Sequence, residues 1–242
     1  MAGLVVGALF DPLGQREAER SDHRQHRPAG DRGGRPVVNG GGRVSPPRLL
    51  PAGPSAARNL GAALVTGGLF AGSAHRFGAH LVLLPYCGFF SVLVVVSTTD
   101  LSHGVIPRRL VYPALGTLGV LFAVVAAADG ERHWLGSAVV GTAAAFAALF
   151  VIWWLAPRGM GFGDVRLSAL IGLATGWIGL LATYVALASA FVFGLLFGIA
   201  VMGLSGLGRT VRIPFAPALA VGAIVAVFWG APIVQAVFHR TI

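Results

Sequence analysis

From residue 60 to the C-terminus the sequence is a succession of long apolar runs separated by short polar breaks. A run of roughly 20 apolar residues is long enough to cross the hydrocarbon core of a bilayer as an α-helix. Inside lipid every backbone polar group must be bonded internally, and this composition favours helices over barrel strands. The pattern therefore predicts an all-α, polytopic membrane helix bundle with about six or seven transmembrane helices. The expected spans are 60–75, 80–98, 110–128, 134–156, 165–182, 184–204 and 215–237.

The composition also indicates a membrane protein. Hydrophobic residues make up 55% of the chain and charged residues only 11%, whereas a soluble globular domain carries about 25% charged residues. The basic side chains are all arginines, and half of them precede residue 60. The others fall in short breaks between apolar runs, which fits the positive-inside rule better than a phosphate-binding face. We therefore expect a lipid bilayer around the protein and no nucleic-acid partner.

The later arginines also predict the topology. Short loops rich in arginine stay on the cytoplasmic side of the membrane. We expect a multi-pass protein of the inner (plasma) membrane with three cytoplasmic loops after residue 100. These loops are marked by Arg108 with Arg109, Arg158 with Arg166, and Arg209 with Arg212.

The first 60 residues differ from the rest of the chain. Residues 1–10 are apolar but too few to cross a bilayer, which takes roughly 20 residues, so we interpret them as the tail or remnant of a first membrane helix. Residues 11–59 are rich in Arg, Gly and Pro, and such a segment buries too little apolar surface to offset the entropy cost of ordering. We expect a flexible cytoplasmic arm there and a membrane-embedded domain over residues 60–242.

Only four acidic side chains follow residue 60. Asp129 and Glu131 share a short loop, where a solvated role is sufficient. Asp100 and Asp164 instead stand at the predicted cytoplasmic ends of membrane spans, where ionisable groups are costly unless paired or hydrated. In a close pair of carboxylates, one can act as general base on a water while the other donates a proton. From the residues alone, catalysis, proton or cation transport, and helix capping all remain open.

Asp164 closes a glycine-rich turn, Pro-Arg-Gly-Met-Gly-Phe-Gly-Asp. Pro157 ends the preceding apolar run, and Gly161 and Gly163 let the backbone bend sharply and approach another segment closely. Asp164 is well suited to begin the next helix by accepting hydrogen bonds from its free N–H groups. Cys87 is the only cysteine, so it permits no intrachain disulfide and no cysteine-based zinc site, and we expect no metal and no cofactor.

Three motifs resemble those of the type IV prepilin peptidase family and stand in that family's order. The segment Gly-Phe-Gly-Asp at 161–164 is similar to the Gly-x-Gly-Asp signature of membrane aspartyl proteases. Asp100, followed by Ile106 and Pro107, resembles the family's first aspartate motif, although Arg108 stands where an asparagine is expected. The segment Ile-Pro-Phe-Ala-Pro-Ala-Leu-Ala at 213–220 resembles a late Ile-Pro-Phe-Gly-Pro segment. Together these motifs extend the resemblance over about residues 60–242.

The resemblance implies an aspartyl endopeptidase that removes the short basic leader of a prepilin or pseudopilin at the cytoplasmic membrane face. It implies that Asp100 and Asp164 form the catalytic pair. Gly161 and Gly163 would give the backbone freedom that brings Asp164 to its partner. His103, three residues after Asp100, is either a plain interfacial histidine or one that tunes the aspartate or touches the substrate.

Bifunctional members of this family carry two Cys-x-x-Cys pairs in a cytoplasmic domain and also methylate the new N-terminus. This chain has a single cysteine, so we expect no N-methyltransferase activity. Residues 3–12 still resemble the family's first helix, which suggests a truncated remnant.

A small proton-coupled transporter is the alternative from another class, although its acids should lie near the bilayer midplane. A catalytically inactive homologue is the second alternative.

Overall fold

A computed structural model describes residues 55–104, 106–130, 132–157, 159–205 and 214–238. Residues 1–10 and the predicted arm up to residue 54 lie outside the described residues. Three of the six arginines that predict the topology also lie outside them, namely Arg158, Arg209 and Arg212, as does Ile213 of the third motif. The domain boundaries expected from the sequence therefore stay predictions.

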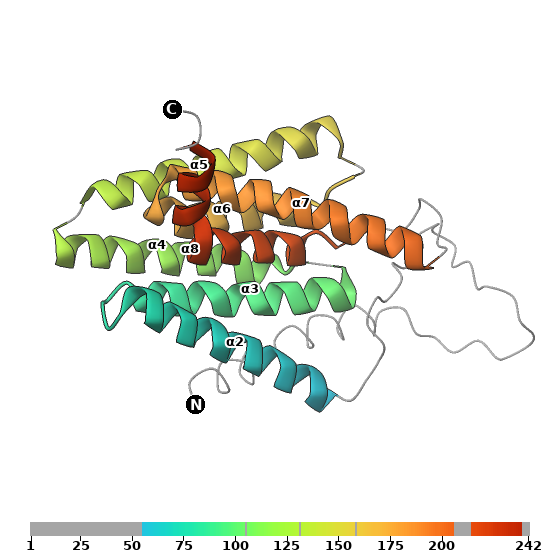
Figure 1. The fold of residues 1–242 in the computed structure, drawn as a ribbon, viewed down its shortest axis with the longest axis horizontal. Helices are drawn as coiled ribbons and strands as arrows, with labels where there is room; N and C mark the ends of the chain where they lie inside the picture. The colour runs from blue at the N-terminus through green and yellow to red at the C-terminus, as the bar shows by residue number, and fades with distance from the viewer. Residues whose placement is uncertain (1–54, 105, 131, 158, 206–213, 239–242) are drawn as a thin grey trace, which may run out of the picture.

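The described residues form seven helices and contain no strand, which confirms the predicted all-α bundle. Consecutive helices run in opposite directions (Figure 1). The helices are α2 (Ser55–Phe77), α3 (Leu83–His103), α4 (Arg108–Asp129), α5 (Arg132–Leu155), α6 (Phe162–Ile178), α7 (Leu180–Ser205) and α8 (Ala216–Phe238).

A single residue, Gly179, separates α6 from α7. Its φ is 148°, and its N–H donates to the carbonyl of Thr175 at 3.1 Å, which ends α6. Side chains with a Cβ rarely adopt this φ, so glycine suits the reversal between the two helices. The fifth predicted span, 165–182, therefore ends too late, because α7 begins at Leu180.

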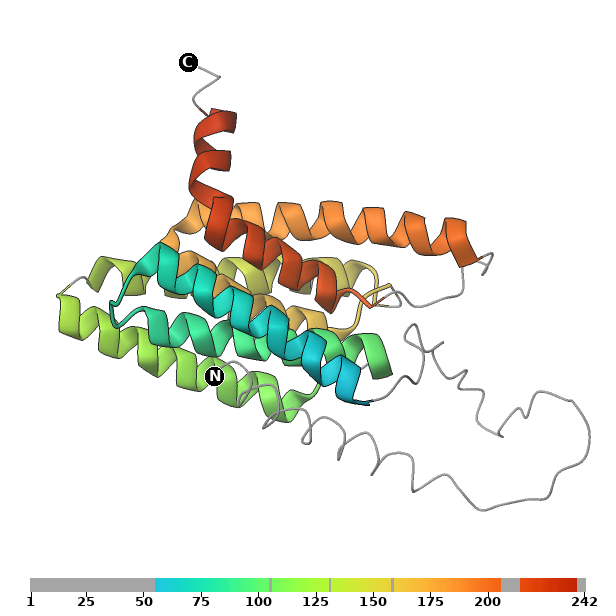
Figure 2. The same ribbon diagram turned by 60° about the horizontal axis from the view of Figure 1, so that its bottom comes forward.

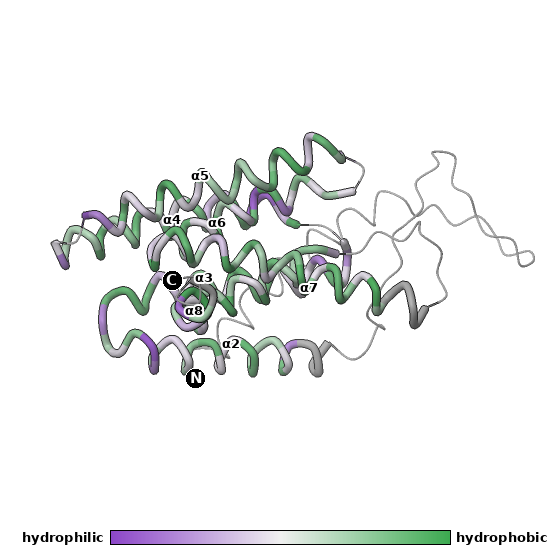
Figure 3. Tube along the Cα trace, turned by 45° about the horizontal axis from the view of Figure 1, so that its top comes forward, coloured by the Kyte–Doolittle hydropathy of each residue, from purple (hydrophilic) through white to green (hydrophobic). Residues whose placement is uncertain are grey.

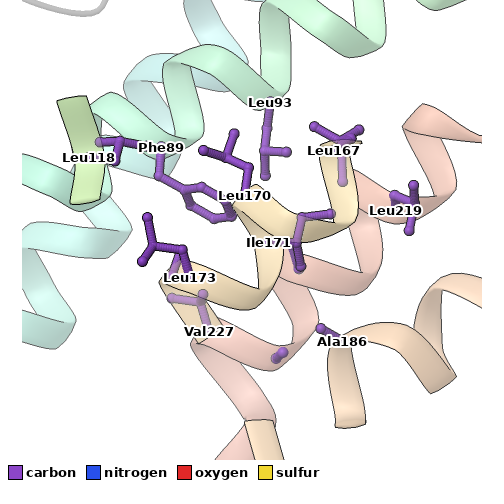
Figure 4. Close-up of a cluster of buried hydrophobic side chains, with 14 of the residues drawn as sticks. Phe89, Leu93, Leu118, Leu167, Leu170, Ile171, Leu173, Ala186, Leu219 and Val227 are labelled. Carbon is purple, nitrogen blue, oxygen red and sulfur yellow. The ribbon is translucent and has the colours of Figure 1, made fainter. Parts of the chain in front are cut away.

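The centre of the bundle is occupied by α6, which contacts α3, α4, α5, α7 and α8. From Asp164 to Trp177 every side chain except that of Arg166 is buried. Figure 4 shows apolar side chains of α3, α4, α7 and α8 gathered around those of α6. A helix that is apolar on all sides is stable when other elements surround it, so protein rather than lipid covers this run.

Five helices are long and apolar enough to cross a membrane: α3, α4, α5, α7 and α8. The central helix α6 has 17 residues and falls short of that length. Large apolar side chains on the outer helices are exposed, for example Val120, Val139 and Leu195, as expected for a lipid-facing surface. In Figure 3 the polar residues gather mainly near the helix ends. The described helices therefore form a polytopic membrane bundle.

Glycines bring the backbones of α5 and α6 into close contact. A Cβ on Gly172 would overlap the carbonyl oxygen of Gly141, and one on Gly176 would lie 2.8 Å from the carbonyl oxygen of Ser137. Small residues at such contacts let membrane helices pack closely. This contact fixes α6 against α5 along much of its length.

The three motif segments meet at one end of the bundle. The end of α3 and the starts of α4, α6 and α8 lie together there in both views (Figures 1 and 2). At the opposite end α8 bends away from the bundle (Figure 2). Pro232 lies inside this helix, and a proline removes a backbone N–H and clashes with the preceding turn, which accounts for the bend.

Candidate active site

Asp100 lies in the last turn of α3 and is buried, with 6% of its surface exposed. The helix ends at His103 because Gly104 adopts a left-handed conformation, with φ 63°, and its N–H donates to the backbone carbonyl of Asp100 at 2.7 Å. Glycine is favoured at such a helix end. The helix dipole disfavours a carboxylate near a C-terminus, so Asp100 needs donors from other segments.

One such donor is the backbone N–H of Ala216, whose nitrogen lies 3.2 Å from Oδ2 of Asp100. Ala216 is the first residue of α8 and is fully buried. It belongs to the third motif of the sequence. The structure therefore joins the first and third motif segments by a hydrogen bond between residues 116 positions apart.

Asp164 is the third residue of α6 and is also buried, with 6% of its surface exposed. Its N–H donates to the carbonyl of Gly161 at 3.1 Å. The N-cap position belongs to Gly161, so α6 begins before Asp164 and the expectation that Asp164 begins this helix is wrong. Its carboxylate still lies in the first turn, where the helix dipole favours negative charge.

A contact between Ile106 and Gly163 brings the two aspartate segments together. A Cβ built on Gly163 would lie 2.9 Å from Cβ of Ile106 and 3.1 Å from its Cδ1. Ile106 stands six positions after Asp100, and Gly163 directly precedes Asp164. This close approach explains why glycine stands at position 163.

The two motif glycines do not adopt backbone angles that require glycine, but the close approach expected from the sequence is present at Gly163. Gly161 has φ −77° and ψ 143°, which any residue adopts. Gly163 lies in the helix and is not among the glycines with positive φ. What the structure requires at Gly163 is the absence of a Cβ, because Ile106 occupies that space.

Two other predicted residues frame the connection between α3 and α4. Pro107 is the N-cap of α4, and its carbonyl accepts the N–H groups of Leu110 and Val111 at 3.1 and 3.3 Å. Its fixed φ suits the start of a helix. His103 is exposed in the last turn of α3. The structure thus gives Pro107 a local structural role and leaves His103 at the protein surface.

Arg166 lies beside the site, and its contacts were not predicted from the sequence. Its guanidinium carbon lies 4.6 Å from the ring centre of Phe162 and 5.4 Å from that of Tyr112 in α4. Phe162 also packs edge-on against Trp153 of α5, with 4.9 Å between ring centres. Cation–π contacts of this kind contribute about 0.5–1 kcal/mol at exposed sites. The spacing of four between Phe162 and Arg166 on one helix is the signal that could have indicated the stacking.

The described structure brings two acid–base groups to one end of the bundle. Two buried carboxylates, Asp100 and Asp164, lie at the same end of the bundle, on helices α3 and α6 that contact each other. Burying charged groups is costly, and a nearby pair of carboxylates favours a state in which one holds a proton. Such a pair can take a proton from one group and give a proton to another.

Comparison with known proteins relates this chain to a protein family. The model of the type IV leader peptidase family matches residues 87–199, which include Asp100, Ile106, Gly163 and Asp164. The prepilin leader peptidase/N-methyltransferase of Bacillus subtilis is 36% identical over 178 residues, which cover 72% of this chain and 67% of that protein. The chain belongs to the type IV leader peptidase family.

Two further relatives match the chain at lower identity. The prepilin leader peptidase/N-methyltransferase of Xanthomonas campestris is 30% identical over 184 residues, which cover 71% of this chain and 59% of that protein. The protein of the same name in Aeromonas salmonicida is 33% identical over 144 residues, which cover 57% of this chain and 47% of that protein. The chain therefore spans between about half and two thirds of these relatives. No solved structure matches it significantly.

The Ile106 contact predicts different effects of alanine at two glycines of the same turn. Gly163→Ala should lower the melting temperature in detergent micelles, because overpacking costs about 1–3 kcal/mol and exceeds the helix-propensity gain of about 0.5–1 kcal/mol. Gly159→Ala is the matched control, since its Cβ would make only an ordinary contact, 3.5 Å from the carbonyl oxygen of Ala156. Equal melting temperatures for the two variants would contradict a tight contact at Gly163.

Proposed function

We propose that the protein is a membrane aspartyl endopeptidase that cleaves the leader of type IV prepilin-like substrates, with Asp100 and Asp164 as its catalytic pair. The observation that carries the proposal is the convergence of two buried carboxylates at one end of the bundle in a member of the type IV leader peptidase family. The relatives are named prepilin leader peptidases, which supports a prepilin or pseudopilin as substrate.

The proposed reaction is the hydrolysis of one peptide bond. A water attacks the scissile carbonyl carbon while one aspartate takes a proton from it, and the other aspartate gives its proton to the carbonyl oxygen. The C–N bond of the tetrahedral intermediate then breaks. The aspartate that took a proton gives it to the leaving amine, and the other aspartate takes a proton back from a hydroxyl group of the intermediate. The products are a carboxylic acid and an amine, so the two carboxyl groups return to one shared proton.

The bundle gives this chemistry a low-polarity setting. Both aspartates are nearly excluded from solvent, and apolar helices surround the start of α6. Electrostatic interactions are stronger where water is excluded. The apolar segment of a prepilin would pack against the helices at this end, and its basic leader would extend toward the connections between them.

We propose that this end of the bundle faces the cytoplasm. Arg108 and Arg109 are exposed at the start of α4, beside the candidate site. Arginine-rich short loops stay on the cytoplasmic side. The other end of α4 carries the exposed Asp129, and acidic residues have little influence on orientation.

Labelling of single cysteines tests this orientation. In a Cys87→Ser background, His103→Cys should react with a membrane-impermeant maleimide only after the cells are permeabilised. Ala128→Cys, also exposed but at the opposite end of α4, should react in intact cells. The reverse pattern of labelling would place the candidate site outside the cytoplasm.

Substitution of each aspartate tests the proposed reaction. Asp100→Asn and Asp164→Asn should each reduce cleavage of a prepilin-like substrate by a factor of roughly 10² to 10⁴, because each removes one proton-transfer group. The assay uses purified protein in detergent, and electrophoresis measures how much of the substrate has lost its leader. Asp129→Asn is the matched control, since that carboxylate is exposed at the other end of the bundle, and it should retain wild-type activity.

Three results would count against the proposal. Cleavage that survives Asp100→Asn or Asp164→Asn would remove that residue from catalysis. A wild-type protein that folds but cleaves none of several prepilin-like substrates would be an inactive homologue. Proton-coupled solute uptake by reconstituted vesicles without any cleavage would favour a transporter.

We also propose that the chain performs only the peptidase reaction. The names of the relatives include N-methyltransferase, whereas the 242 residues contain one cysteine and hence no Cys-x-x-Cys pair. Mature substrate produced in the presence of a methyl donor should therefore carry an unmodified N-terminal amine in mass spectrometry. The Bacillus subtilis relative serves as the control. A methylated product made by this chain alone would contradict the proposal.

A further inference from the structure

The start of α8 has an unusual distribution of hydrogen-bond donors. The first N–H groups of an α-helix have no acceptor within the helix and are normally satisfied by a capping side chain. The carbonyl of Phe215 accepts the N–H of Leu219 at 3.1 Å, so Phe215 occupies the N-cap position, yet its side chain has no oxygen. Pro217 has no N–H, and the N–H of Ala216 donates to Asp100. The carboxylate of α3 therefore caps α8 from another helix.

We propose that the backbone N–H of Ala216 positions Asp100 for catalysis by fixing the rotation of its carboxylate. The inference rests on the proposed function, because it concerns the aspartate that this function makes catalytic. Proton transfer and water attack require the reacting groups to be held in a narrow range of distances and angles. A backbone N–H at 3.2 Å from Oδ2 supplies one such constraint. Ala216 is thus a positioning residue that acts through Asp100.

The position of this N–H is fixed by the ring of Phe215. The ring packs against Gly194 of α7, where a Cβ built on this glycine would lie 2.5 Å from Cε2 of Phe215. It also contacts Phe191 of α7, with 5.5 Å between ring centres. Because α7 and α8 are in extensive contact, the donor is carried by a packed helix pair and not by a loose loop.

The side chain of Ala216 contributes little to this role. It is a methyl group with no polar atom, and the donor belongs to the backbone. A substitution that keeps the N–H should therefore preserve activity, whereas one that removes it should not. Proline is the substitution that removes a backbone N–H, and it is well accepted at the first position of a helix.

The experiment compares Ala216→Pro with Ala216→Gly in the full-length protein, using a prepilin-like substrate. Loss of a hydrogen bond to a charged group should lower kcat of Ala216→Pro about tenfold or more. The KM should change little, because this N–H donates to Asp100 and so acts through the aspartate. Ala216→Gly keeps the donor and should stay within about twofold of wild-type kcat.

A second variant, in α7, should displace the same N–H indirectly. A Cβ introduced by Gly194→Ala should displace Phe215 and lower kcat in the same direction, again with KM nearly unchanged. Gly72→Ala is its control, since a Cβ there would also meet an aromatic ring of α8, Phe228 at 3.1 Å, but far along the helix from Ala216. Gly72→Ala should leave kcat unchanged. If Ala216→Pro fails to fold, Gly194→Ala decides the question.

Several results would overturn the inference while the proposed function stands. One is a wild-type kcat for Ala216→Pro. Another is a loss of kcat in Ala216→Gly as large as that in Ala216→Pro. The third is an effect of Ala216→Pro on KM alone. If the wild type cleaves nothing, the proposed function fails instead.

Thermal unfolding tests the contact between Ala216 and Asp100 without any cleavage assay. If the N–H of Ala216 is bonded to Asp100, Ala216→Pro should lower the melting temperature less in an Asp100→Ala background than in the wild type. Equal losses in both backgrounds would overturn the inference.

Discussion

The burial of α6 on every side is the constraint that organises the other helices. Because almost all of its side chains from Asp164 to Trp177 are inside the protein, each neighbouring helix must present an apolar face to it. The same burial takes a carboxylate into the apolar interior at the start of α6. The bundle can accept that charge only where helix ends and backbone donors gather, which is at the end where α3 stops and α4, α6 and α8 begin (Figure 1).

Helix ends contribute to the electrostatics of the site. Asp164 lies in the first turn of α6, and Asp100 accepts the first N–H of α8. Both carboxylates therefore lie near the positive end of a helix dipole, which stabilises negative charge, and for Asp100 this opposes the unfavourable dipole of its own helix α3. The guanidinium of Arg166 is stacked on two aromatic rings. Helix geometry thus offsets part of the cost of burying the acids.

The sequence was sufficient to predict the helical bundle, the approximate spans and the location of Asp100 and Asp164 at helix ends, because long apolar runs and the scarcity of acids are local signals. It misplaced the start of α7, since Gly179 ends α6 through its φ and apolar runs on both sides hide the break. It predicted a close approach at Gly163 but not the residue that is approached. The reason for that glycine is Ile106, a residue 57 positions earlier, and such a contact cannot be read from composition or spacing. Likewise, the hydrogen bond between Ala216 and Asp100 joins distant segments and is visible only in the fold.

The close contact of α5 with α6 has a mechanical consequence. Glycines lock these two helices backbone to backbone, and α7 and α8 form the other extensive pair. Asp164 belongs to the first pair, whereas Asp100 is bonded to the second through Ala216. The two acids of the candidate dyad are therefore held through different helix pairs, so their separation depends on how α6 packs against α3 and α8 and not on one helix alone.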